Sequence, residues 1–256
     1  MNGKIEAMKF LYEMDGSILQ QTGQDGYTAL HWAAHEGHVA AVNKLMEWDP
    51  KLGGMTPFIV AAGQGRVDVM EFLYAKRKDL LTQTTNNGDT ALHQAAYKGK
   101  IEVMKFLYEM DGSILQQKGQ DGWNAIHAAA QEGHLAVVNK LLEWDPKLID
   151  SRVAKYGWTP LMKGAMKGHV DVMEALYEKR KDLLTQTDNK GDTPLHLAAY
   201  WGSSAAVSQL LEWGGGALLD IKNNSETPWD KAEGKPEIRE IMRPYKPACG
   251  PCCVIM

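Results

Sequence analysis

The sequence predicts an all-α solenoid: a stack of helix pairs joined by short loop fingers and followed by a flexible C-terminal tail. Three observations carry this prediction. A phrase of the form Thr-Pro-Leu-His-x-Ala-Ala recurs along the chain, Gly-containing turns precede it, and longer amphipathic segments follow it. The phrase begins at residues 28, 56, 90, 124, 159, 193 and 227, so successive copies lie 28, 34, 34, 35, 34 and 34 residues apart.

Each copy of the phrase predicts a short first helix. In the clearest copy, residues 193–202, the Thr193 hydroxyl can cap the helix and Pro194 suits its first turn. Leu195 and the paired alanines give a small packing face, and Gly202 ends the helix. Asn124 takes the Thr place in one copy.

The turns and the second helices follow from the same periodicity. Asp25-Gly26, Asn87-Gly88, Asp121-Gly122 and Lys190-Gly191 suit tight reversals that need a positive φ. Apolar residues at 137, 138, 141 and 142 mark the buried face of a second helix. The units end in Glu-Trp-Asp-Pro or in Lys-Arg-Lys, and the basic triplets are read as solvated charge at helix C-termini.

The chain also carries a duplicated block of several repeats. Residues 4–21 match residues 100–117 at every position except one, so the chain begins in mid-repeat. We predict a repeat domain over residues 1–243, with a partial first repeat, six repeats and a degenerate capping repeat, and a tail over residues 244–256. The segment after Trp48 is seven residues shorter than its duplicate, so the finger at residues 51–55 is expected to be absent or stunted.

Thr-Pro-Leu-His at 193–196, Gly-His at 133–134 and 168–169, and Leu-Leu-Glu at 141–143 resemble the ankyrin-repeat family. The resemblance covers about residues 1–243, and the chain is similar to eukaryotic cytosolic and plant-type members of the family. It implies binding of a protein partner through loop tips and the concave face of the first helices, with no chemistry of its own. Ile59 and Met162 stand where His is usual and Gly164 replaces an Ala, so the second and fifth units are expected to pack less regularly.

Composition and motifs argue against other classes of function. With 28 basic and 32 acidic residues the chain is mildly acidic, which disfavours nucleic acid as a partner. His31 and His35 are spaced i, i+4, but the histidines at the phrase's His place are expected to bond between loops, and no cysteine lies nearby. We therefore expect no metal, cofactor, catalytic residue or small-molecule substrate. A zinc enzyme using His31 and His35 remains the weaker alternative.

Aromatic residues give the candidate partner surface. By repeat position, Tyr27, Trp123 and Trp158 precede a first helix, beside the loop tips, and Tyr97, Tyr200 and Trp201 end one. Exposed aromatics commonly anchor protein interfaces, so we interpret these six residues as partner-binding. For Trp48, Trp144 and Trp213, which end second helices, packing is the favoured interpretation.

The last four residues, Cys253-Val254-Ile255-Met256, form a Cys-aliphatic-aliphatic-X box, and Met at the last place favours a farnesyl group on Cys253. Such endings resemble those of prenylated Ras-type small GTPases. One prenyl chain binds membranes only weakly, so Cys252, or Cys249, is expected to accept palmitate. Cys249-Gly250-Pro251-Cys252 also spells a thioredoxin active site, but it lacks a helix and sheet to lower the thiol pKa.

The function that best fits these patterns is a non-enzymatic adaptor, held by its tail at the cytoplasmic face of a membrane, with the plasma membrane expected. An unmodified cytosolic adaptor or inhibitor is the alternative. A thiol-redox enzyme that uses Cys249 and Cys252 is a third and weaker interpretation.

Overall fold

The computed structural model describes residues 2–24, 26–48 and 57–246. Within these ranges every regular element is an α-helix or a 3-10 helix, and the predicted all-α stack of helix pairs is confirmed. The described residues form two compact units, which divide between residues 120 and 121. The short finger expected at residues 51–55 lies outside the described residues, as do Cys249, Cys252 and Cys253.

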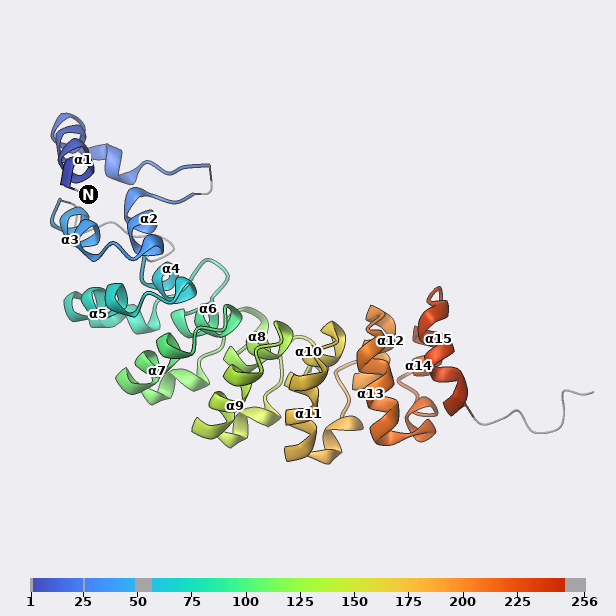
Figure 1. Cartoon of the computed structure of the whole chain (residues 1–256). Coiled ribbons are helices and arrows are strands. Elements are labelled where there is room, and N and C mark those ends of the chain that lie inside the picture. Colours follow the sequence, from blue (N-terminus) through green and yellow to red (C-terminus); the bar gives the residue numbers. More distant parts are fainter. Residues whose placement is uncertain (1, 25, 49–56, 247–256) are drawn as a thin grey trace, which may run out of the picture. The chain divides into compact units, whose positions relative to one another are not determined.

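In the N-terminal unit, α4 packs against α2 and α6, and each of these first helices is followed by a second helix (Figure 1). The elements are α1 (Asn2–Met14), η1 (Gly16–Gln20), α2 (Ala29–Glu36), α3 (Val39–Trp48), α4 (Pro57–Gln64), α5 (Val67–Lys76), η2 (Lys78–Thr82), α6 (Ala91–Tyr97), α7 (Ile101–Met110) and η3 (Gly112–Gln116). The duplicated sequence gives duplicated structure: in both copies an Asp, at 15 or 111, accepts a bond from the backbone N–H two residues on.

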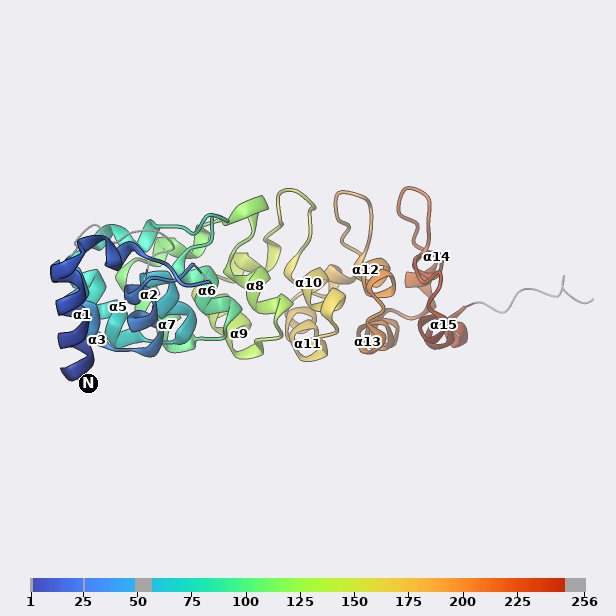
Figure 2. The same ribbon diagram turned by 90° about the horizontal axis from the view of Figure 1, so that it is seen from above.

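In the C-terminal unit the first helices α8, α10, α12 and α14 form one layer and the second helices α9, α11, α13 and α15 the other (Figure 2). The elements are η4 (Gln120–Gly122), α8 (Ala125–Gln131), α9 (Leu135–Trp144), η5 (Pro146–Asp150), α10 (Pro160–Lys167), α11 (Val170–Lys179), η6 (Lys181–Leu184), α12 (Pro194–Trp201), α13 (Ser204–Gly214), η7 (Gly216–Leu219), α14 (Pro228–Lys231), α15 (Pro236–Met242) and η8 (Arg243–Tyr245). Three loop fingers protrude before α10, α12 and α14.

The repeated phrase caps the first helices α2, α6, α8, α10, α12 and α14 as predicted; the capping place of α4, Thr56, lies outside the described residues. Thr193 has extended backbone, its hydroxyl accepts the N–H of His196, and Gly202 ends α12 with φ of 76°. Asn124 takes the Thr place before α8, and its side chain accepts the backbone N–H of His127 in a capping box. A side-chain acceptor at this place satisfies an N–H that the helix leaves unpaired.

The irregular packing expected for the fifth unit is absent from α10. Met162 replaces the usual His, yet its Sδ lies 3.4 Å from the Thr159 N–H and the Thr159 hydroxyl still accepts the Met162 N–H. The side chains of Pro160–Met166 are all buried, and α10 is as long as α12. The thioether accepts the bond that an imidazole nitrogen accepts elsewhere, so the repeat keeps its shape.

The degenerate last repeat extends further than predicted. Helix α14 has only four residues, and after α15 the chain continues as η8, which includes Pro244 and Tyr245 of the predicted tail. Lys246 Nζ lies 4.0 Å from the centre of the Trp229 ring. Residues 244–246 therefore belong to the folded unit.

Candidate protein-binding surface

Histidines and backbone hydrogen bonds hold neighbouring fingers of the C-terminal unit together. His127 Nε2 lies 3.2 Å from the carbonyl oxygen of Ser151 and 3.1 Å from that of Trp158, and His196 Nε2 lies 3.1 Å from that of Glu226. These bonds confirm the expectation for His127 and His196, which connect loops. Burial lowers the pKa of His196, so the neutral imidazole is the form that fits this site.

The fingers also bond directly to one another. The Asn189 N–H donates to the carbonyl of Tyr156 at 2.9 Å, and Arg152 Nη1 donates to the carbonyls of Gly157 and Thr187 at 3.0 and 2.7 Å. One step further along the stack, Asn223 Nδ2 donates to Asp192 Oδ1 at 2.5 Å. The aromatic side chains that the fingers carry are consequently set on a fixed frame.

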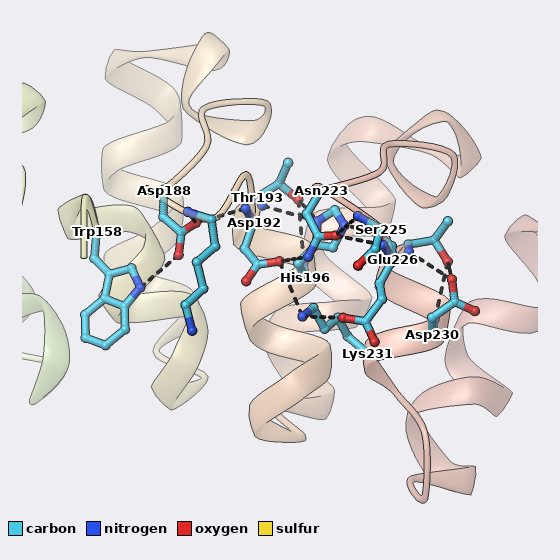
Figure 3. Close-up of polar contacts among 12 residues, drawn as sticks. Trp158, Asp188, Asp192, Thr193, His196, Asn223, Ser225, Glu226, Asp230 and Lys231 are labelled. Carbon is cyan, nitrogen blue, oxygen red and sulfur yellow. Dashed lines mark hydrogen bonds and ion pairs between the residues drawn. The ribbon is translucent and has the colours of Figure 1, made fainter. Parts of the chain in front are cut away.

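Trp158 is the centre of the aromatic residues in this unit. Its ring stacks on Tyr156, with centroids 4.1 Å apart and planes 13° apart, and it packs against the buried cluster of Met162, Met166 and Leu197. Its indole N–H donates to Asp188 Oδ2 at 3.1 Å (Figure 3). Trp158 is therefore half-buried and held at both its face and its edge.

Lys163 lies between two tryptophans. Its side chain belongs to α10, the residue is only 3% exposed, and Nζ lies 4.2 Å from the centre of the Trp123 ring and 4.5 Å from that of Trp158. Burial, with a smaller effect from Lys167, lowers the pKa of Lys163 to about 8. The ring faces supply the attraction that a buried ammonium needs. Sequence analysis missed this residue, although a Lys at the place that Leu197 takes in the next repeat was a visible signal.

Tyr200 and Trp201 are the exposed part of the predicted surface. Both end α12, they are 56% and 55% exposed, and their rings meet edge to face with centroids 5.7 Å apart. Beside them lies a pocket of about 340 Å³, which we call the finger pocket. Its walls include Tyr156, Trp158, Tyr200 and Trp201, and two carboxylates, Asp188 and Asp192, face it from the finger before α12.

The N-terminal unit holds the other two predicted aromatics. Tyr27 is half-buried and stacks on His31, with centroids 5.4 Å apart, and Tyr97 is exposed at the end of α6 with Lys98 Nζ 5.1 Å from its ring. Trp32, which sequence analysis did not single out, is 46% exposed and meets Tyr27 edge to face at 5.7 Å. Its repeat position, four residues after the capping Thr28, is the sequence feature that could have indicated it.

The tryptophans that end second helices pack as expected. Trp213 stacks on Tyr177 with ring centroids 4.4 Å apart, and Trp48 stacks on Tyr12 at 5.9 Å, where the Tyr12 hydroxyl donates to the Trp48 carbonyl at 2.7 Å. Lys140 Nζ lies 5.5 Å from the centre of the Trp144 ring. These rings are half-buried against their own units and differ in this from Tyr200 and Trp201.

His31 and His35, the pair considered for zinc, have other partners. Nδ1 of His31 lies 2.7 Å from the Thr28 hydroxyl, and Nδ1 of His35 lies 2.9 Å from Glu36 Oε1. In the part of the chain that the structure describes, no three His, Cys, Asp or Glu side chains gather as a metal site. None of the helices described there combines the length and the apolar character needed to cross a membrane.

Comparison with known proteins identifies the repeat. A family model described as "Ankyrin repeats (3 copies)" matches residues 1–84, 77–152 and 145–225. The chain belongs to the ankyrin-repeat family. Its sequence is 36% identical over 86 residues to a probable 26S proteasome regulatory subunit p28 of Saccharomyces cerevisiae, a match that covers 30% of this chain and 38% of that protein. Over 67 residues it is 39% identical to the mouse ankyrin repeat and SAM domain-containing protein 6, covering 26% of this chain and 8% of that protein.

The ankyrin fold is also that of a solved structure. The crystal structure of the human ASB11 ankyrin repeat domain matches with a TM-score of 0.68 and 22% identity, over 87% of this chain and all of that one. The chain spans well under half the length of the two curated relatives it matches. The ankyrin-repeat fold typically serves as a non-enzymatic module that binds other proteins, and this chain belongs to that family.

Proposed function

We propose that this ankyrin protein is an adaptor that binds a protein partner through the finger side of its C-terminal unit. The observation that carries the proposal is the exposure of two adjacent large aromatic side chains, Tyr200 and Trp201, at the mouth of the finger pocket. More than half of each residue is in contact with solvent, so neither contributes much to the stability of α12. Aromatic residues in such positions commonly provide most of the binding energy of a protein interface.

The surface is prepared for binding because its supporting groups are fixed. Trp158 is held by Asp188 and Tyr156, and the fingers that carry these residues are bonded to one another. A partner that meets a surface already in place loses less conformational entropy on binding. A rigid surface supports the binding of a partner at the fingers and at the exposed ends of the first helices. Such binding requires no chemical reaction.

The experiment replaces Tyr200 and Trp201 together with Ala. The variant and the wild type are expressed as tagged full-length chains, and the proteins recovered with each are quantified by mass spectrometry. We expect the recovery of specific partners to fall at least about tenfold, while the melting temperature changes by no more than a few degrees. Trp32→Ala is the control, because Trp32 is an exposed aromatic residue of the N-terminal unit that is not among the six predicted partner-binding residues.

Two results would contradict the proposal. Partner recovery could be unchanged in the double variant, which would place recognition elsewhere. Alternatively, the double variant could lose stability as strongly as a core substitution, about 2–5 kcal/mol, which would make the two rings packing residues.

We further propose that the adaptor is attached to the cytoplasmic face of a membrane, the plasma membrane being the expected one, by a farnesyl group on Cys253 and a palmitoyl group on Cys252 or Cys249. The support is the sequence: the box at 253–256 has the required form, and all three cysteines lie in the last eight residues. An unmodified adaptor or inhibitor free in the cytosol is the alternative. Because the box acts only at a free carboxyl end, the mass of the C-terminal peptide from a eukaryotic host is the first measurement.

Fractionation of cells tests the attachment. We expect Cys253→Ser to move the protein to the soluble fraction, since prenylation precedes further acylation. Cys252→Ser leaves a single prenyl chain, which binds reversibly, so this variant should spread between cytosol and internal membranes. Membrane recovery of Cys253→Ser equal to that of wild type would exclude prenylation as the anchor and leave the cytosolic adaptor.

A further inference from the structure

The finger pocket combines aromatic walls with buried negative charge. Tyr156, Trp158, Tyr200 and Trp201 line it together with Leu197, and the carboxylates of Asp188 and Asp192 face the same space of about 340 Å³. That volume lies within the range of pockets that hold a small ligand, so the pocket can receive one side chain of a partner protein. The chemistry of its lining indicates which side chain.

Asp188 and Asp192 differ in whether a carboxylate oxygen remains without a hydrogen-bond donor. Asp188 Oδ1 accepts the N–H groups of Lys190 and Asp192, at 2.8 and 2.9 Å, and Oδ2 accepts the indole N–H of Trp158 (Figure 3). Asp188 is therefore occupied in holding the finger and the Trp158 ring.

Asp192 is only 5% exposed, and a single one of its oxygens is used. Oδ1 accepts Asn223 Nδ2 and lies 3.8 Å from Lys231 Nζ, whereas Oδ2 makes no hydrogen bond or ion pair with any described residue. In Figure 3 this second oxygen points away from the bonds that the first one makes. Among the described residues the only buried side-chain oxygen or nitrogen without a partner is Gln117 Oε1, so Asp192 Oδ2 is reached by solvent. A ligand in the pocket can therefore donate to Oδ2 in place of water.

Three lysines also line the pocket, and each is accounted for. Lys231 is committed to Glu226, whose Oε2 lies 2.7 Å from its Nζ, and that bond raises the pKa of Lys231. Lys155 pairs with Asp121 at 3.6 Å and lies over the Tyr156 ring at 5.2 Å. Lys190 is exposed at the finger tip. Asp188 and Asp192, 9% and 5% exposed, are the buried carboxylates of the pocket, and Lys231, whose side chain is 18% exposed, is the cation beside them.

We propose that the finger pocket accepts an arginine side chain of the partner protein, an inference that rests on the proposed protein-binding function. The faces of the Trp158 ring are already covered by Tyr156 and Lys163, so the rings open to a ligand are those of Tyr200 and Trp201. A guanidinium is planar, so it stacks on these exposed rings while its N–H groups donate to Asp192 Oδ2. A hydrogen bond between two charged groups away from water is about twice as strong as one between neutral groups. Tyr200 and Trp201, which are exposed in the free protein, lie at the mouth of the pocket and are covered together with the guanidinium when the partner binds.

The test is a titration of the full-length chain followed by the indole N–H signals in ¹H–¹⁵N spectra, with Trp158 and Trp201 assigned from Phe variants. The probe is the capped peptide acetyl-Gly-Ser-Arg-Ser-Gly-amide. The control peptide carries citrulline in place of Arg, which keeps the planar shape and removes the charge. We expect saturable shifts of both indole signals with the Arg peptide and affinity at least about tenfold weaker with the citrulline peptide.

The variants separate the pocket from the rest of the surface. Asp192→Asn keeps the side-chain shape and should weaken Arg-peptide binding at least about tenfold. Asp89→Asn is the control, since Asp89 takes the same repeat position in the N-terminal unit, and it should bind like wild type. Trp201→Ala, at an exposed position, should weaken binding in a protein whose unfolding curve is unchanged.

Several results would overturn the inference. They are equal affinity for the Arg and citrulline peptides, unchanged binding in Asp192→Asn, no saturable shift with the Arg peptide, and tighter binding of the same peptide with Glu at its centre. The last would mean that the lysines at the rim define the ligand. If any of these is found while Tyr200→Ala with Trp201→Ala still loses the partner, the arginine pocket is wrong and the adaptor function stands. If partner recovery is also unchanged, both are wrong.

Discussion

The indole N–H of Trp158 donates to Oδ2 of Asp188 across 3.1 Å, so a ring at the start of α10 is held by the finger that precedes α12. Through this bond one repeat positions an aromatic side chain of its neighbour. The same carboxylate accepts two backbone N–H groups of its own finger. A single side chain thereby shapes the finger and orients the aromatic wall of the pocket.

Trp158→Phe tests this relationship. Phe keeps an aromatic face against Tyr156 and Met162 but removes the indole donor, leaving Asp188 Oδ2 without its partner. We expect a loss of about 1–2 kcal/mol in the free energy of unfolding, measured by urea denaturation. Trp201→Phe is the control, because its ring is exposed, and it should change stability by less than about 0.5 kcal/mol. Equal effects of the two substitutions would mean that the bond to Asp188 does not hold the ring.

Lys163 predicts a pH dependence of stability. Its pKa in the folded protein is about 8, below the ordinary value of 10.5, so the folded state disfavours the ammonium form. Between these two values the unfolded chain binds more protons than the folded one, and the stability contributed at this site therefore rises as the pH rises from about 8 to 10.5. Lys163→Met should remove that rise, which for such a shift is at most about 3 kcal/mol.

The measurement is urea denaturation of wild type and Lys163→Met at several pH values across this window. The difference in stability between the two proteins isolates Lys163 from the other lysines and tyrosines that titrate there. We expect Lys163→Met to be the more stable protein at pH 7, with its advantage shrinking as the pH rises. A difference that stays constant over the window would show that Lys163 is not desolvated.

Gly157 is required where two fingers touch. Its φ is 77°, and a Cβ there would lie 2.4 Å from Asn189 Oδ1 and 2.8 Å from the Asn189 nitrogen. Gly234, in the same unit, has a φ of 74° and open space around it. We expect Gly234→Ala to cost about 1 kcal/mol from backbone strain alone and Gly157→Ala to cost about 1–3 kcal/mol more. The two unfolding free energies give the difference directly, and equal costs would mean that the fingers are not in contact at Gly157.

Much of the fold was predictable because local sequence features, namely capping residues, terminal glycines and apolar spacing, determine where each helix begins, ends and packs. Thr193 and Gly202 mark the two ends of α12, and the apolar residues of α9 lie on its buried face. Met162 was misjudged, since a departure from the repeat's usual His was expected to disturb packing. The prediction considered residue type alone, whereas Thr159 needs only an acceptor and a thioether sulfur provides one.

The candidate site was predictable in part. Repeat position placed Trp158 before a first helix and Tyr200 and Trp201 at the end of one, and in the structure all three line the finger pocket. The pocket was not predictable, since it depends on how the side chains of Trp158, Asp188 and Asp192 are held across neighbouring fingers. The insertion of Lys163 between Trp123 and Trp158 was not predictable either. These features result from side-chain geometry across three repeats, which no local pattern in the sequence records.

The most direct measurement of the central claim, that the finger side of the C-terminal unit is the recognition surface, is site-specific photo-crosslinking. A benzophenone amino acid is placed at Lys190, on the rim of the finger pocket, or at Glu174, which is exposed on α11. Both proteins are illuminated in cells, and adducts are detected on denaturing gels. The account predicts a defined adduct from position 190 that disappears when Tyr200 and Trp201 are replaced by Ala, with no such adduct from position 174. Equal adducts from both positions, or an adduct at 190 that persists in the Tyr200→Ala and Trp201→Ala background, would contradict it.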